Sequence, residues 1–86
     1  MEKILVTGGS GFIGTNLIEH LSKDTQYEIQ NIDIVKPKIS AQDKFWVQVD
    51  LRKHDAVVAA VEAVAPDYVI HIVERTDLNG KTLHDY

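Results

Sequence analysis

The chain has 86 residues, and because domains run from ~50 to ~250 residues we expect a single domain. Its 9 basic and 13 acidic residues give a net charge of −4, which argues against binding nucleic-acid phosphates through a basic face. It has no cysteine, which excludes a disulfide framework and a thiolate metal site. No apolar run approaches the ~20 residues of a membrane helix, and Met1-Glu2-Lys3 does not open a signal peptide. We therefore expect a cytoplasmic protein whose partners include neither nucleic acid nor membrane.

The first half of the chain alternates between strand and helix patterns. The continuous apolar run at residues 4–6 predicts a strand that is buried on both faces. Apolar side chains then recur at helical spacing over residues 13–21, which predicts an amphipathic helix. A weaker alternation over residues 27–35 predicts a second strand. Residues 36–44 contain Pro37 and few large apolar side chains, so we expect a loop there.

The second half repeats this alternation. A third strand is predicted at residues 45–49, and an apolar helical face at 57–64 predicts a second helix. Pro66 is expected to end that helix, because proline disfavours the helical conformation in the residue before it. Residues 68–73 predict a fourth strand, and residues 74–86 are polar and turn-rich. Strands that alternate with helices predict an α/β fold with a mainly parallel sheet and crossover helices.

The strongest motif is the segment Thr7–Gly14, TGGSGFIG, between the first strand and the first helix. Gly8 can adopt a positive φ at the tight turn, Gly11 lets the backbone approach a pyrophosphate, and Gly14 lets the helix pack against the strand. The N–H groups near Phe12 and Ile13, at the start of the helix, would then hold the anion. Glycines at this spacing in this context predict binding of a dinucleotide.

Two other interpretations of the glycines were weighed. A strand-to-helix turn can hold one or two glycines without binding a ligand. A P-loop requires a lysine between its last glycine and the hydroxyl residue, but Thr15 directly follows Gly14, so this motif is excluded.

Asp33 lies at the end of the second predicted strand, 19 residues after Gly14. A carboxylate there can accept hydrogen bonds from both ribose hydroxyls, and it would repel the 2′-phosphate of NADP, so the sequence favours NAD. Lys36 is the nearest cation and leaves NADP as the less favoured cofactor. The alternative is an exposed aspartate at the strand end that binds no ligand.

Asp50 and Leu51 follow the third predicted strand, at the sheet edge where ligands of open α/β sheets bind. The carboxylate could accept from an adenine amino group while Leu51 covers the ring. A helix N-cap or a turn aspartate explains Asp50 equally well. The four histidines lack metal-ligand spacing, so no metal site is predicted, and His71 is expected to be a packed or hydrogen-bonded core residue.

The glycine turn with the preceding KILV, Asp33, the Asp50-Leu51-Arg52 triplet and the segment 68–72 resemble one known family over essentially the whole chain. This is the extended short-chain dehydrogenases/reductases, and more narrowly the NAD-dependent epimerases/dehydratases that act on nucleotide sugars. The resemblance implies a partial Rossmann fold of about four strands in the order 3-2-1-4, with residues 1–86 as a single dinucleotide-binding domain from the N-terminal half of the family fold. It implies NAD as cofactor, bound at Gly8, Gly11, Phe12, Ile13, Gly14, Asp33, Asp50 and Leu51.

The chain departs from the family pattern in two places. Val73 and Glu74 stand where the family usually has two small residues beside the cofactor. No Tyr-x-x-x-Lys occurs in the 86 residues, so we assign no catalytic residue. We expect an NAD(P)-binding segment that is incomplete and inactive alone, with a nucleotide sugar bound only in a full-length parent. The alternative is a small noncatalytic interaction or assembly module, which self-associates through the open edge of strand 68–73 or through exposed helix faces.

Overall fold

The computed structural model describes residues 1–72, which form a parallel four-stranded sheet flanked by helices. The strand order is β3-β2-β1-β4, which confirms the predicted order and fold class. The strands are β1 (Glu2–Thr7), β2 (Tyr27–Asp33), β3 (Trp46–Gln48) and β4 (Tyr68–His71). The helices are α1 (Phe12–Leu21), α2 (His54–Val64) and the 3₁₀ helix η1 (Ser40–Phe45).

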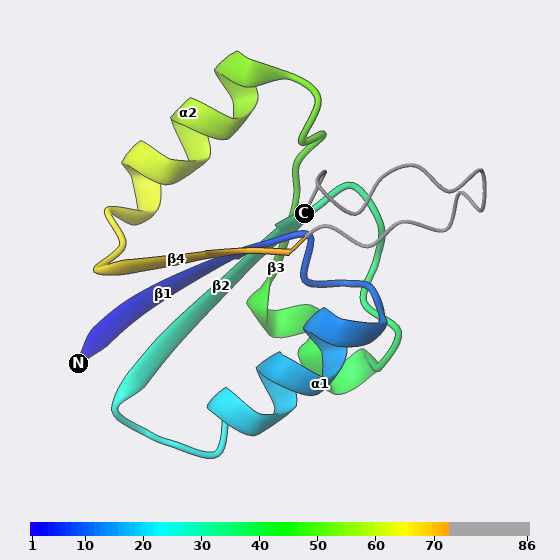
Figure 1. The fold of residues 1–86 in the computed structure, drawn as a ribbon, viewed down its shortest axis with the longest axis vertical. Coiled ribbons are helices and arrows are strands. Elements are labelled where there is room, and N and C mark those ends of the chain that lie inside the picture. The colour runs from blue at the N-terminus through cyan, green and yellow to red at the C-terminus, as the bar shows by residue number, and fades with distance from the viewer. Residues whose placement is uncertain (73–86) are drawn as a thin grey trace.

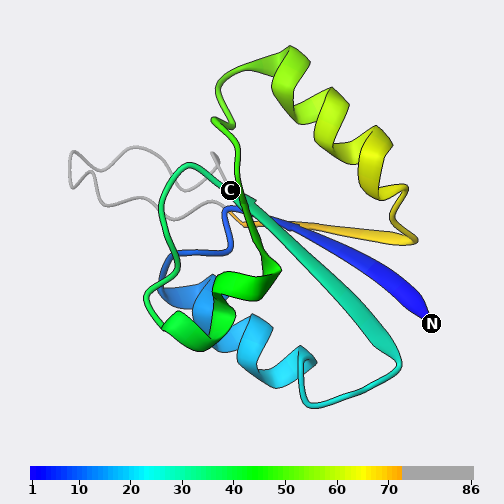
Figure 2. The same cartoon turned by 180° about the vertical axis from the view of Figure 1, so that it is seen from behind.

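Helices cover both faces of the sheet, with α1 and η1 on one side and α2 on the other (Figures 1 and 2). Side chains of β1 alternate between the two cores, because successive residues of a strand point to opposite faces. Ile4 and Val6 pack on the α1 side, whereas Leu5 packs on the α2 side. All three are buried, so the prediction of a first strand buried on both faces is confirmed.

The segment expected to be a loop contains η1, and the packing of Gln42 explains the difference. This side chain is buried, and its Nε2 donates to the carbonyl oxygen of Thr15 in α1, at 2.9 Å. The Gln42 N–H also donates to the carbonyl of Ile39, at 2.9 Å. The contact that holds this short helix against α1 is made by a polar residue. The spacing of apolar residues cannot reveal such a contact, so the sequence predicted a loop.

The element ends differ from the prediction by a few residues, as is usual when ends are inferred from pattern. β2 ends at Asp33, because an Asp33 carboxylate oxygen accepts the N–H of Val35 at 3.1 Å and turns the chain away. α2 ends at Val64, before Pro66 as predicted, and Ala65 follows in the left-handed conformation at φ 49°. Val73, Glu74, His84 and the rest of segment 73–86 lie outside the described residues. Within the described part, no helix is long and apolar enough to cross a membrane.

Candidate functional site

The candidate site lies at the carboxyl ends of the strands, beside β1. The crossover from β1 to β2 runs through α1 on one face, and the crossover from β3 to β4 runs through α2 on the other (Figure 1). These two crossovers therefore run on opposite faces of the sheet, and β1 and β4 lie side by side where the strand order reverses. Open α/β sheets bind ligands in the crevice at such a switch point.

The glycine turn connects β1 to α1 at this edge, and its backbone requires glycine at two positions. Gly8 has φ +75°, and a Cβ there would collide with the carbonyl oxygen of Ile72 at the end of β4. A Cβ at Gly14 would fall on the backbone of Gly9, so α1 can approach the turn only without a side chain. The positive φ predicted for Gly8 is thus confirmed, whereas the close packing at Gly14 is against Gly9 of the turn and not, as predicted, against the strand.

Gly11 precedes α1 as its N-cap, with φ −82° and ψ −169°, an extended conformation open to any residue. Its carbonyl accepts the Thr15 N–H at 2.9 Å and the Thr15 hydroxyl at 2.7 Å. The backbone conformation at position 11 therefore does not require glycine. The first turn of α1 holds no acidic side chain, so its positive dipole end is not neutralised there.

Asp33 lies beside the glycine turn, as its spacing from Gly14 predicted. One carboxylate oxygen accepts the N–H of Ser10 at 3.0 Å, and the other accepts that of Val35. A carboxylate has about four acceptor positions, so both oxygens retain capacity for ligand hydroxyls. The nearby cation Lys36 lies 3.9 Å from a carboxylate oxygen of Asp43.

The sequence did not predict a buried polar contact between the turn and β2, which Ser10 of the turn makes with Asn31. Both are only 1% exposed. Asn31 Oδ1 accepts the N–H of Gly9 at 2.9 Å, and its Nδ2 donates to Ser10 Oγ at 3.1 Å. One signal could have revealed Asn31: it is a polar residue on the same strand face as Asp33, two positions earlier, in a strand with a buried core.

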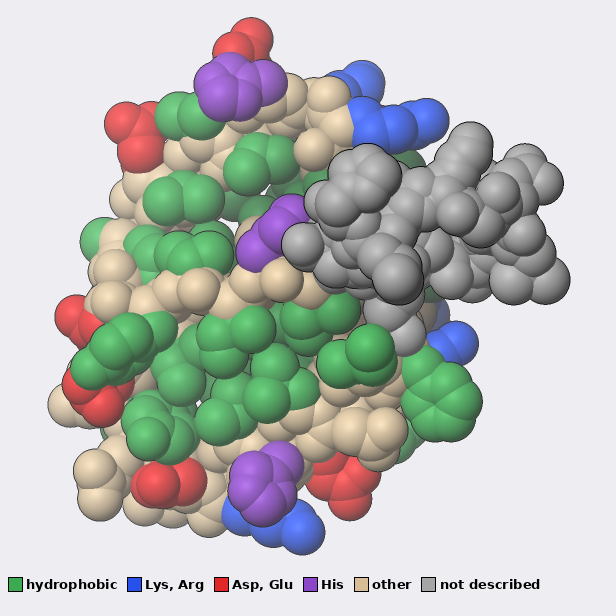
Figure 3. Space-filling view, viewed as in Figure 1, with side chains coloured by type: hydrophobic (Ala, Val, Ile, Leu, Met, Phe, Trp, Pro, Cys, Tyr) green, Lys and Arg blue, Asp and Glu red, His purple; other side chains and the backbone are tan. Residues whose placement is uncertain are grey.

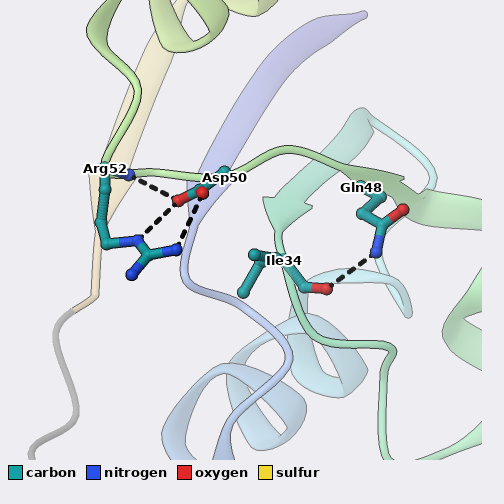
Figure 4. Close-up of polar contacts among 4 residues, drawn as sticks. All are labelled: Ile34, Gln48, Asp50 and Arg52. Atoms are coloured by element: carbon teal, nitrogen blue, oxygen red, sulfur yellow. Dashed lines mark hydrogen bonds and ion pairs between the residues drawn. The ribbon is translucent and has the colours of Figure 1, made fainter.

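Asp50 pairs with Arg52 in a tight turn at the same edge of the sheet (Figure 4). One oxygen of Asp50 accepts both the Arg52 N–H and Nε at 3.0 Å, and the other lies 3.0 Å from an Arg52 terminal nitrogen. Asp50 thus stabilises a turn and is not the N-cap of α2, which is Lys53, and its role toward a ligand stays a prediction. Leu51 packs against the core on the α2 side.

The Arg52 guanidinium and N–H lower the pKa of the Asp50 carboxyl to about 2. A depressed pKa means that the pair stabilises the fold above about pH 4 and that this contribution is lost as the pH falls through about 2. We expect Arg52→Ala to raise the Asp50 pKa part of the way to its ordinary value, because the backbone N–H at position 52 remains. Carboxyl carbon chemical shifts recorded against pH measure both values, and an ordinary pKa in the unsubstituted chain would contradict the assignment.

His71 departs from the expected core position. Its side chain is exposed, yet its Nδ1 is hydrogen-bonded to the Thr7 hydroxyl across β1 and β4. The prediction of a hydrogen-bonded histidine is confirmed, and that of a core histidine is wrong, because β4 lies at the sheet edge. Among the residues that the structure describes, no group of three or more His, Asp or Glu side chains could hold a metal ion.

Comparison with known proteins matches residues 4–84 to the model of the NAD dependent epimerase/dehydratase family. A dTDP-glucose 4,6-dehydratase from Neisseria meningitidis serogroup B is 48% identical over 88 residues, covering 92% of this chain and 25% of that protein. A probable dTDP-glucose 4,6-dehydratase from Sinorhizobium fredii is 31% identical over 86 residues, covering 90% of this chain and 24% of that protein. The chain thus spans about a quarter of the length of these curated relatives.

Solved structures share the fold. A dTDP-glucose 4,6-dehydratase from Bacillus anthracis, solved in complex with NAD, superposes with a TM-score of 0.72 at 20% identity, over 88% of this chain and 28% of that one. The Bordetella bronchiseptica enzyme WbmG, solved with NAD and UDP, gives a TM-score of 0.65 at 26% identity, over 91% of this chain and 27% of that one. The family match and the shared fold agree with the glycine turn and Asp33, and the chain belongs to the NAD-dependent epimerase/dehydratase family.

Proposed function

We propose that the chain binds NAD, with the pyrophosphate at the glycine turn and the adenosine ribose at Asp33. The observation that carries this proposal is the Asp33 carboxylate, which is held 3.0 Å from the N–H of Ser10 in the turn. That contact supports the proposal, because one dinucleotide requires its ribose acceptor and its phosphate-binding backbone to be neighbours. The proposed binding residues are Gly8, Gly11, Phe12, Ile13, Gly14, Asp33, Asp50 and Leu51.

Asp50 and Leu51 are proposed to border the adenine. Asp50 sits at the carboxyl edge of the sheet, after β3, and Arg52 fixes the direction of its carboxylate. Arg52 occupies three of the roughly four acceptor positions of this carboxylate, and the one that remains can accept from the adenine amino group. Arg52 also lowers the pKa of the Asp50 carboxyl to about 2, so this carboxyl stays ionised at a more acidic pH than an ordinary aspartate.

We further propose that residues 1–86 form a dinucleotide-binding domain of a nucleotide-sugar dehydratase or epimerase. Curated relatives carry such names, and NAD, when bound, supplies hydride acceptance from a sugar carbon. The 86 residues contain no Tyr-x-x-x-Lys, so they supply cofactor binding and no tyrosine–lysine pair for proton transfer. The chain alone is therefore expected to bind NAD without turning over a nucleotide sugar.

We expect the chain to bind NAD at least about tenfold more tightly than NADP, a difference of about 1.4 kcal/mol. The 2′-phosphate of NADP would meet the negative charge of Asp33, and the nearest cation, Lys36, is paired with Asp43. Titration calorimetry with both cofactors measures the ratio. Asp33→Asn removes the charge but keeps one acceptor oxygen, so it should narrow the ratio. Equal or tighter binding of NADP by the unsubstituted chain would contradict the role of Asp33.

A second function, assembly with another copy of the chain, is favoured by the edge strand β4. Within residues 1–72, β4 pairs with β1 alone, and the side chains of Tyr68 and Val69 are each 53% exposed. Figure 3 shows hydrophobic side chains gathered on this side of the molecule. We propose that two copies pair through β4, because an unguarded edge is a template for strand addition. Sedimentation over a wide concentration range should show a dimer that Val69→Lys dissociates, whereas a monomer at every concentration would exclude it.

A further inference from the structure

The glycine turn rests on a polar side chain that the proposed function does not use. Asn31 and Asp33 lie two positions apart in β2, so both point to the α1 face of the sheet. Asn31 accepts the N–H of Gly9 through Oδ1 at 2.9 Å, and Asp33 accepts the N–H of the next residue, Ser10, at 3.0 Å. Strand β2 thus binds two successive N–H groups of the turn.

These contacts are buried, and an amide is the side chain that satisfies them all. Asn31 uses its oxygen for the Gly9 N–H and its nitrogen for Ser10 Oγ, at 3.1 Å. An aliphatic residue would leave the Gly9 N–H without a partner, and a carboxylate would bury a negative charge at a position that is 1% exposed. A buried donor without a partner destabilises the conformation that buries it.

The same contact fixes where the turn can lie. A Cβ on Gly9 would stand 2.5 Å from Asn31 Oδ1, so the backbone of Gly9 sits directly on the amide. With the Gly9 and Ser10 N–H groups directed at β2, the turn continues into Gly11 and the start of α1 at Phe12. The position of Gly9 therefore determines the position of Gly11 and Phe12, the part of the turn that is proposed to bind the pyrophosphate.

We propose that Asn31 is a positioning residue, which holds the glycine turn in the conformation that receives the cofactor pyrophosphate. This inference rests on the proposed NAD binding. Beyond NAD binding, we infer that Asn31 acts through the Gly9 N–H and touches no part of the cofactor. Loss of the amide should therefore change the turn in the ligand-free chain and weaken NAD as a consequence.

The test compares Asn31→Ala with Gln30→Ala in the full 86-residue chain. Gln30 is the adjacent residue of β2, on the opposite face, and its side chain also donates one hydrogen bond, to the carbonyl of Phe45 at 2.6 Å. Asn31→Ala is expected to weaken NAD at least tenfold, and Gln30→Ala less than twofold. Equal NAD affinities in the two variants would overturn the proposal, because they would reduce Asn31 to a contributor to stability.

Amide hydrogen exchange in the absence of ligand separates this proposal from the proposed function. Exchange at Gly9, relative to the β1 amides, should accelerate at least tenfold in Asn31→Ala and stay unchanged in Gln30→Ala. If the unsubstituted chain fails to bind NAD, the proposed function fails and the exchange at Gly9 alone decides the positioning role. Unchanged exchange at Gly9 would overturn it.

Ser10→Ala keeps the test decisive if Asn31→Ala does not fold. It removes the oxygen that accepts from Asn31 Nδ2 and leaves the chain otherwise intact, so the amide is held by one contact fewer. We expect Gly9 exchange to accelerate and NAD affinity to fall together, each about threefold. No change in either quantity would overturn the proposal.

Discussion

Gly14→Ala is expected to lower the free energy of unfolding by about 3 kcal/mol, more than half of the ~5 kcal/mol that a small domain has. The new Cβ would fall on the backbone of Gly9, which cannot give way as a flexible side chain can. A loss of stability would be informative, because Gly→Ala inside a helix ordinarily stabilises the protein by up to ~1 kcal/mol. Urea denaturation, followed by circular dichroism, measures the change.

Asn16→Ala is the matched control for this substitution. Asn16 lies in the same helix, is exposed, and donates a hydrogen bond within that helix to the carbonyl of Phe12, at 3.2 Å. It should therefore alter stability by less than ~0.5 kcal/mol. A Gly14→Ala chain as stable as the control would show that α1 does not pack on the turn as described.

Gly11→Val is expected to weaken NAD at least about 100-fold, or about 2.7 kcal/mol, while the chain remains folded. The backbone of Gly11, at φ −82°, accepts a β-branched residue, so the fold does not demand glycine there. The valine methyl groups would occupy the space that the pyrophosphate needs above the start of α1. Titration calorimetry gives the affinity, and circular dichroism reports the fold.

Position 11 is also the N-cap of α1, so a series of substitutions with increasing side-chain volume is needed to separate the loss of the cap from the loss of space for the ligand. Gly11→Ala adds one methyl group and should weaken NAD less than Gly11→Val, in the order of side-chain volume. A folded Gly11→Val chain with the NAD affinity of the unsubstituted chain would refute the phosphate-binding role of the turn.

The sequence predicted the features that local chemistry decides. Glycine spacing marked the turn after β1, and the prediction that Gly8 needs a positive φ rested on one residue type. The apolar run in β1 predicted burial on both faces, since a short run without alternation that ends at glycines is typical of a strand covered from two sides. Asp33 was placed at the turn by its position at the end of β2.

The sequence did not predict features that depend on a polar partner distant in the chain. Gln42 holds η1 against α1 by donating to the carbonyl of Thr15, 27 positions earlier. The spacing of apolar residues gives no sign of such a contact. Asn31 meets Gly9 across 22 positions for the same reason. The pairing of Asp50 with Arg52 is local, but the residues alone allowed a cap, a turn or a ligand contact equally.

The measurement that tests the proposed cofactor site most directly is a titration of the isotope-labelled chain with NAD, followed through its amide proton–nitrogen spectrum. We predict saturable shifts that are largest at Gly11 and Phe12, at the start of α1, and at Asp33, with the amides around Gln30 and Val64 unmoved. That second region lines a separate groove of about 280 Å³ beside α2. Saturable shifts centred on that groove, or no shift at the glycine turn at saturating NAD, would contradict the proposed site.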